Sequence, residues 1–184
     1  MKGKIFLIIV ILLWAGVLYK SGFLSPKPKF PLKVKIVQAR SSLKVLDEPY
    51  KIKRSKIIKI DKLYFPERNY LYHYLYGNLK FYKNFLMFIE TEFEMLKSQK
   101  ITFYINSDDG FRLKIDGKKV CEYIKDRPFG KTVCDITLKK GLHKMSLKYF
   151  QGYGKLGLVG IYEINGKKYY IGENSKYIKF YENN

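Results

Sequence analysis

The stretch that decides the fold is Phe103–Val120, FYINSDDGFRLKIDGKKV. Short segments of aromatic and β-branched residues flank the polar turn Ser107–Gly110, and the dipeptide Asp116-Gly117 follows one segment later. Asp-Gly between alternating segments is a strong signal for a two-residue hairpin, because both central residues need a positive φ. The stretch therefore predicts consecutive antiparallel strands, and it places two adjacent acids on a tight turn.

The same pattern continues to the C-terminus and also appears upstream. Short apolar runs alternate with turn residues, among them Asn165-Gly166, and Leu32–Val37 and Lys56–Ile60 alternate as strands do. Phe85–Leu96 has a period of two, which favours a half-buried strand over a helix. No long amphipathic helix is evident. The sequence predicts an all-β domain, an antiparallel β-sandwich that is jelly-roll-like.

Length and charge bound the class of protein. The chain has 184 residues, 47% of them hydrophobic and 17% aromatic, enough for one domain plus a short appendage. The net charge is +20, and without residues 1–24 there remain 33 basic and 16 acidic residues, a net +17. Such a surface attracts polyanions, including nucleic acid, acidic lipid and charged polysaccharide. The alternative is that scattered lysines reflect a general compositional bias.

Residues 1–24 predict a membrane anchor helix. The apolar run Ile5–Tyr19 has lysines on both sides and contains the expected anchor residues Ile5, Leu12, Trp14 and Tyr19. The run is shorter than the roughly 20 residues that span a bilayer, but Lys20 can snorkel to the interface. A cleaved signal peptide is the alternative, although no clean small-x-small cleavage site follows. We expect an uncleaved anchor, a Pro/Lys-rich spacer over residues 25–31 and a domain over residues 32–184.

The two cysteines, Cys121 and Cys134, indicate the compartment. They flank a loop between two predicted strands, and a disulfide there would add about 3 kcal/mol of stability. Such bridges persist outside the cytosol. A count of lysines around the anchor favours a cytoplasmic C-terminus, but long domains translocate regardless of nearby charge. We therefore expect a single-pass membrane protein with its domain on the extracytoplasmic side; two unpaired buried cysteines are the alternative.

The segment from Ile101 to Gly154 resembles a known family, the PA-fourteen domain. This is the β-sandwich module of toxin protective antigens, flocculin-type adhesins and some glycosidases. The matching features are Ser107–Gly110, Asp116-Gly117, Gly141–His143 and Tyr149-Phe150, in that order. The resemblance implies a β-sandwich and a binding role. The stretch Asn69–Asn78 stands where the family has a tyrosine-rich opening motif.

The resemblance also implies a metal site. In the adhesin members the two adjacent aspartates, joined by a cis peptide, bind calcium, and the ion holds sugar hydroxyls. By position these are Asp108 and Asp109, with Ca²⁺ as the cofactor; Asn165 and Asn174 are candidates for a further ligand. Calcium takes six to eight hard oxygens, so two carboxylates are a reasonable beginning. The alternative is a purely structural turn in which Asp108 caps backbone amides.

Four tyrosines around His73 form a second candidate ligand surface. Tyr70, Tyr72, Tyr74 and Tyr76 would all face one side of a sheet at strand spacing, and tyrosine gives a large contact area at low entropic cost. With Asn174 they are the candidate ligand-binding residues. The alternative is a rim that packs on the core with its hydroxyls at the water edge.

Motifs for catalysis are sparse. The chain has no Gly-x-Ser-x-Gly, no zinc-ligand spacing and no phosphate loop, and we interpret Glu90, Glu92 and Glu94 as a solvated face. The sequence thus predicts a non-catalytic, exported binding module for a glycan or an acidic envelope polymer. The resemblance implies that calcium at Asp108 and Asp109 takes part in binding, with the structural turn as the alternative. One alternative is a structural or assembly protein that binds a protein partner. A third interpretation, a basic nucleic-acid-binding module, conflicts with an exported location.

Overall fold

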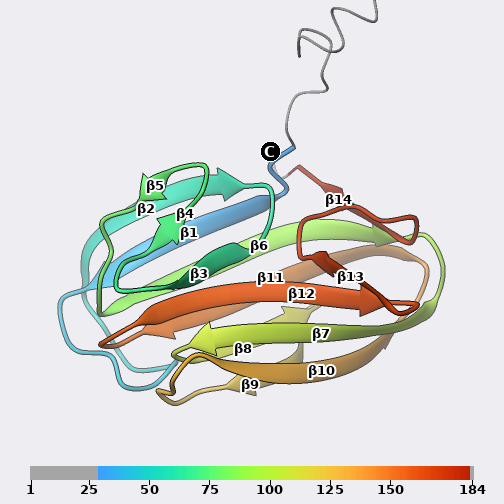
Figure 1. Ribbon diagram of the computed structural model, residues 1–184. Helices are drawn as coiled ribbons and strands as arrows, with labels where there is room; N and C mark the ends of the chain where they lie inside the picture. The colour runs from blue at the N-terminus through green and yellow to red at the C-terminus, as the bar shows by residue number, and fades with distance from the viewer. Residues whose placement is uncertain (1–28, 183–184) are drawn as a thin grey trace, which may run out of the picture.

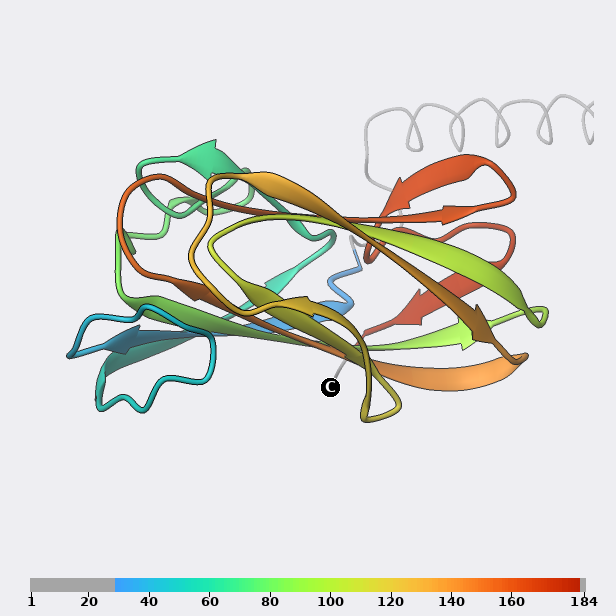
Figure 2. The same cartoon turned by 90° about the horizontal axis from the view of Figure 1, so that it is seen from below.

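The computed structural model describes residues 29–182, which form two β-sheets packed face to face (Figures 1 and 2). The predicted anchor, with Ile5, Leu12, Trp14 and Tyr19, and most of the spacer lie outside these residues. Within residues 29–182 no helix is long and apolar enough to cross a membrane. Every strand pairing is antiparallel, so the predicted all-β sandwich is confirmed.

One sheet has seven strands. Its order is β2 (Ile52–Ile60), β1 (Leu32–Ala39), β6 (Phe85–Met95), β11 (Gly141–Gln151), β8 (Phe111–Ile115) and β9 (Lys118–Tyr123). The seventh strand, β14 (Ile178–Tyr181), pairs with the last residues of β6, beyond the point where β1 has left it. β1 and β14 therefore share one edge of β6.

The second sheet has five strands. Its order is β10 (Gly130–Leu138), β7 (Gln99–Asp108), β12 (Leu156–Ile164) and β13 (Lys167–Tyr170), and β3 (Tyr64–Arg68) pairs with the first half of β12. A short ribbon of β4 (Tyr72–His73) and β5 (Gly77–Asn78) lies apart from both sheets.

Alternation of side chains explains why these segments are strands. In β7, Ile101, Phe103 and Ile105 are buried, while the residues between them are partly exposed. β6 buries its own alternate residues in the same core, so the prediction of a strand over Phe85–Leu96 is confirmed. Burying each such side chain contributes about 1.5–3 kcal/mol, which makes the shared core the main stabilising term.

The two predicted hairpin turns are present. Asp116 and Gly117 have φ values of 51° and 76°, and Asn165 and Gly166 have φ values of 49° and 73°. Both central residues of each turn thus adopt the left-handed conformation that a two-residue hairpin requires. The turns connect β8 to β9 and β12 to β13.

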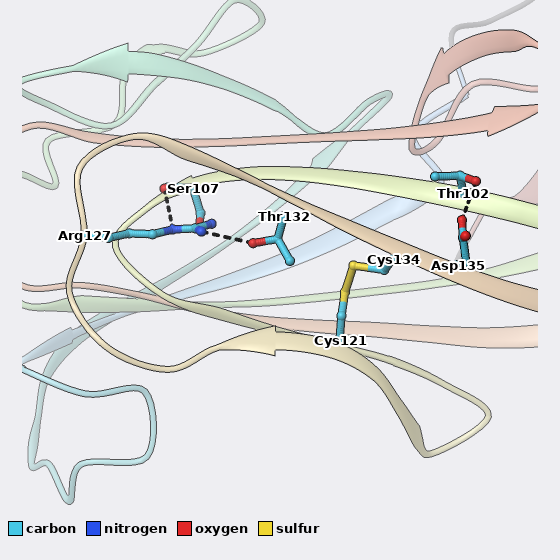
Figure 3. Close-up of a disulfide and its surroundings, with 7 residues drawn as sticks. All are labelled: Thr102, Ser107, Cys121, Arg127, Thr132, Cys134 and Asp135. Atoms are coloured by element: carbon cyan, nitrogen blue, oxygen red, sulfur yellow. Dashed lines mark hydrogen bonds between the residues drawn. A yellow bond between two sulfur atoms is a disulfide. The ribbon is translucent and has the colours of Figure 1, made fainter.

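The disulfide joins the two sheets. Cys121 lies in β9, at one edge of the seven-stranded sheet, and Cys134 lies in β10, at one edge of the five-stranded sheet (Figure 3). Their Cα atoms are 5.9 Å apart. The predicted bridge is present, and it lies between strands of opposite layers, so it closes one side of the sandwich.

The double variant Cys121→Ser, Cys134→Ser should be less stable by about 3 kcal/mol, because the unfolded chain regains the freedom that the bridge removes. For a chain of this size that loss lowers Tm by about 6–12 °C. Calorimetry of both proteins tests this, with the wild type under reducing agent as the matched control. An unchanged Tm, or free thiols in the native protein by mass spectrometry, would contradict the bridge.

Candidate functional site: an aspartate pair at the loop end of the sandwich

Asp108 and Asp109 lie where the chain crosses between the sheets. Asp108 is the last residue of β7 in the five-stranded sheet, and Gly110 leads into β8 in the seven-stranded sheet. The side chains are buried, with Asp108 7% and Asp109 4% exposed, and the peptide bond between them is cis. The turn thus has the arrangement that the resemblance implied.

The carboxylate of Asp109 connects two loops. Its Oδ1 accepts a hydrogen bond from the backbone N–H of Arg127 (3.2 Å), and its Oδ2 accepts one from the N–H of Gly152 (2.7 Å). Arg127 belongs to the β9–β10 connection and Gly152 to the β11–β12 connection. Gly152 cannot be replaced without a shift, since a Cβ there would lie 2.5 Å from the carbonyl oxygen of Leu43.

Asp108 has a different environment. Its backbone carbonyl accepts a hydrogen bond from the buried Tyr149 hydroxyl, which also lies 2.7 Å from Gln151 Oε1. Within residues 29–182, however, no donor bonds to its carboxylate. Burial, followed by the charges of Asp109 and Glu67, raises the pKa of Asp108 to about 7. This mostly buried carboxylate has no donor among the described residues but keeps some contact with solvent, and its raised pKa makes it a candidate for a functional role.

Positive charge near the pair comes from Arg127 and Lys155, which both favour the ionised form of Asp108. The guanidinium of Arg127 bonds to Ser107 through the carbonyl oxygen (3.2 Å) and Oγ (2.7 Å), and to Thr132 Oγ1 (3.0 Å) (Figure 3). Lys155 lies 3.5 Å from Glu67. Both cations are thus already committed to other groups, and they only partly offset the effect of burial.

Burial also raises the pKa of Asp109, although the two backbone N–H donors act against it. The pair therefore presents two buried carboxylates of which only one has its hydrogen bonds satisfied. These hard oxygens suit calcium, which takes six to eight of them. Among residues 29–182 no group of three or more His, Cys, Asp or Glu side chains could hold a metal. A calcium ion at the pair would therefore need oxygens of other kinds, such as carbonyl groups, side-chain amides, water or sugar hydroxyls.

Asn165 and Asn174 are too far away to share this site. Asn174 Oδ1 accepts the N–H of Phe180 (2.7 Å) beside β14, which pairs with the final residues of β6. Gln151, next to the aspartates, pairs instead with Phe85, the first residue of β6. Eleven strand residues span about 35 Å, so Asn174 lies at the opposite end of the sandwich. Asn165 is at that end too, 3.4 Å from the first residue of β7.

The predicted tyrosine ladder was wrong in its geometry. Of residues 69–76, only Tyr72 and His73 are in a strand. The chain turns directly after them, because the fully buried His73 accepts a hydrogen bond at Nδ1 from the backbone N–H of Leu75 (3.3 Å). The hydroxyl of Tyr74 bonds to Asp61 and that of Tyr76 to the carbonyl of Lys59 (2.7 Å). The tyrosines thus cover a folded loop.

Tyr70 and Tyr72 lie nearer to the aspartates than the other two tyrosines do. Their rings stand 5.9 and 4.3 Å from the guanidinium of Arg68, which pairs with Leu156 at the start of β12. Gly157, the next residue of β12, pairs with Asp108. These two side chains are half-buried and stay candidates for ligand contact.

Sequence reasoning missed three residues of the site, Arg127, Gly152 and Tyr149, as partners of the aspartates. The turn residues Gln151–Gly154 and the strand before them were visible as part of the family pattern, so Gly152 and Tyr149 had a signal. Arg127 had none, because a single arginine in a loop between strands carries no pattern.

Comparisons with known proteins agree with this geometry. No family model and no curated protein matches the chain. Among solved structures, the PA14 domain of the antifreeze protein MpAFP matches with 12% identity and a TM-score of 0.60, over 79% of this chain and 88% of that one. The PA14 sugar-binding domain from an RTX adhesin matches with 14% identity and a TM-score of 0.59, over 74% and 90%. The chain has the PA14 fold.

Two further solved structures are similar to the chain. Epithelial adhesin 6 A domain from Candida glabrata, solved with Galb1-3GlcNAc, matches with 14% identity and a TM-score of 0.53, over 78% of this chain and 84% of that one. An anti-sigma factor domain-containing protein matches with 16% identity and a TM-score of 0.60, over 77% of this chain. The chain spans only 46% of that protein, so the similarity concerns one part of it.

Replacing Asp109 by Ala should destabilise the PA14 fold by about 2–5 kcal/mol, since the buried N–H of Gly152 and the half-buried N–H of Arg127 lose their acceptor. Urea unfolding measures the change. Asp108→Ala is the matched control, because it removes a carboxylate of equal burial that accepts no hydrogen bond. Equal losses in the two variants would show that the carboxylate of Asp109 does not connect the loops.

The stability of the metal-free protein should fall as pH rises through about 7. The pKa of Asp108 is about 7 in the folded state against an ordinary 3.8, so the folded chain holds this proton more tightly than the unfolded chain does. The stability that this bound proton adds is fully present below about pH 4. It is lost between about pH 4 and pH 7, and the loss is complete once the carboxyl of the folded chain has ionised.

Asp108→Asn should flatten this part of the profile and be more stable than the wild type above about pH 7. Urea unfolding in the presence of a chelator, at several pH values, provides the comparison. A variant that loses stability as steeply as the wild type would show that Asp108 does not carry the effect.

Proposed function

We propose that this chain is a non-catalytic glycan-binding module of the cell envelope that uses Asp108 and Asp109, with calcium, to hold its ligand. The observation that carries the proposal is the buried carboxylate of Asp108, which has no hydrogen-bond donor among residues 29–182 yet lies beside a second carboxylate. The similarity to a sugar-binding PA14 domain and to an adhesin domain solved with a galactoside supports the ligand class.

The two aspartates have separate tasks in this proposal. The fold needs Asp109 to hold the β9–β10 and β11–β12 connections, whereas nothing in the described fold uses the carboxylate of Asp108. A buried charge that destabilises the protein alone is explained if a bound cation neutralises it. Calcium, when bound, supplies that charge and leaves coordination positions for sugar hydroxyls. Asp109 fixes the site's position, and Asp108 adds its free oxygens.

The proposed location and attachment follow from other parts of the chain. The Cys121–Cys134 bridge is typical of proteins outside the cytosol. We propose that the apolar run Ile5–Tyr19 anchors the protein in the membrane and that the net +17 of residues 25–184 attracts acidic envelope polymers. Tyr70 and Tyr72 are the proposed aromatic contacts of the ligand.

A structural role at the envelope is the second candidate, and one observation favours it. The hydrogen bonds of Asp109 already give the turn a purpose without any ligand. In that case the domain binds a protein partner, and both calcium and chelators leave its properties unchanged.

Calcium titrated into the chelator-stripped, full-length protein should release heat in a saturable manner. Asp108→Asn should lose at least tenfold in calcium affinity, because an amide has no charge to offer the ion, and it should stay folded. A panel of galactosides, tested with and without chelator, then measures ligand binding. The matched control is Asp135→Asn, which removes an exposed carboxylate that pairs with Lys100 on the outer face.

Two results would contradict the proposal. The absence of binding heat in the wild type would make the turn structural. Calcium binding that is unchanged in Asp108→Asn would place the ion elsewhere on the protein.

A further inference from the structure

A positively charged cleft of about 500 Å³ lies between β2 and the segment that connects β5 to β6. The residues that line it are Gln38, Lys53, Arg54, Lys80, Tyr82 and Lys83. Four of the six carry a positive charge and none is acidic. The composition of the lining thus selects for an anion, since nothing within the cleft neutralises the four cations.

Among the described residues no acid neutralises these cations, although Arg54 bonds to the Lys80 carbonyl oxygen and Lys83 to the Tyr153 hydroxyl. Within residues 29–182 none of the four forms a salt bridge; the ten ion pairs all lie on other parts of the sandwich. A second cleft, on the outer face of the seven-stranded sheet, differs in this respect. It is lined by Lys33 and Lys144 together with Glu90 and Glu92, so it has no excess of either charge.

The backbone around the cleft is held in place. Gln38 Nε2 donates to the carbonyl oxygens of Lys83 (2.6 Å) and Asn84 (2.9 Å), which fastens the β5–β6 connection to β1. The guanidinium of Arg54 donates to the carbonyl oxygen of Lys80 and lies 4.4 Å from the centre of the Phe81 ring. These contacts fix the spacing between the two walls and the position of the Arg54 guanidinium before any ligand arrives.

The cleft is connected to the aspartate pair through one loop. The N–H of Asn84 donates to the carbonyl oxygen of Gly152 (2.8 Å), and the N–H of Gly152 donates to Asp109 Oδ2 (2.7 Å). Lys83 Nζ lies 4.3 Å from the centre of the Tyr153 ring, and Tyr153 is 67% exposed. The exposed ring of Tyr153 thus lies on the same loop as Gly152, which bonds to Asp109, and beside Lys83 of the cleft.

We propose that this cleft binds the carboxylate or phosphate groups of an anionic glycan. The exposed rings of Tyr82 and Tyr153 offer apolar faces for sugar rings beside the cations. The inference rests on the proposed glycan-binding function for its ligand class, but the cleft itself needs no metal.

The test uses oligogalacturonate, a glycan with one carboxylate per sugar, and the full-length protein in the presence of a chelator. The triple variant Lys53→Gln, Lys80→Gln, Lys83→Gln should bind at least tenfold more weakly than the wild type. Arg54 is left in place because it holds the Lys80 backbone. Fluorescence anisotropy of the labelled oligomer gives the affinities.

The matched control is Lys139→Gln, Lys140→Gln, Lys167→Gln. These lysines are exposed at the opposite end of the sandwich, Lys139 and Lys140 between β10 and β11 and Lys167 at the start of β13, and their removal changes the net charge by the same amount. The control should retain its affinity to within twofold. Because the assay contains a chelator, failure of the Asp108–Asp109 site leaves cleft binding intact, and the two proposals fail separately.

Three results would overturn the inference. Equal losses in the cleft variant and the control would show that only overall charge matters. Failure of the wild type to bind oligogalacturonate would exclude the ligand class. Tighter, cleft-dependent binding of a single-stranded oligonucleotide of equal charge, or of phosphatidylglycerol vesicles, would assign the cleft to nucleic acid or to membrane instead.

Discussion

The hydrogen bonds of the Asp109 carboxylate join three connections that are far apart in the sequence. The turn after β7, the β9–β10 connection and the β11–β12 connection meet at this one group, through the N–H of Arg127 and of Gly152. Gly152 in turn accepts from Asn84, which brings in the β5–β6 connection as well. The shape of the whole loop end thus depends on a single buried acceptor, and both proposed binding surfaces are built around it.

Beside this structural aspartate lies one that the fold does not need. Asp108 and Asp109 are almost equally buried, but hydrogen bonds stabilise only the second carboxylate. Natural chains usually remove such an unpaired buried acid, because most other side chains would be more stable there. The proposed calcium ion would account for its presence, and the difference between the neighbours would then separate a ligand-binding carboxylate from a structural one.

Sequence reasoning predicted the fold well for a physical reason. The signals that predicted it are local: alternating apolar residues in the strands, and Asp116-Gly117 and Asn165-Gly166 at the hairpin turns. The structure agrees with these signals at almost every strand and turn. The aspartate pair and the disulfide were also visible from the sequence. The predictions that failed concern contacts between distant parts of the chain. Asn174 was expected near Asp108 but lies at the opposite end of the sandwich, and the tyrosines around His73 were expected to lie in one strand. A buried histidine that turns the chain, and strand pairings that separate Asn174 from Asp108, are decided by tertiary contacts that no local pattern contains.

The shared edge of β6 has a consequence for how the module is displayed. β1 begins and β14 ends at neighbouring residues of β6, since Lys33 pairs with Glu90 and Tyr181 with Glu92. The described chain thus enters and leaves the sandwich at adjacent points, about 20 Å along β6 from the residue that pairs with Gln151. A tether at either point would attach the module away from its loop end. The aspartates and the cationic cleft, which lie at the loop end, would then point away from the site of attachment.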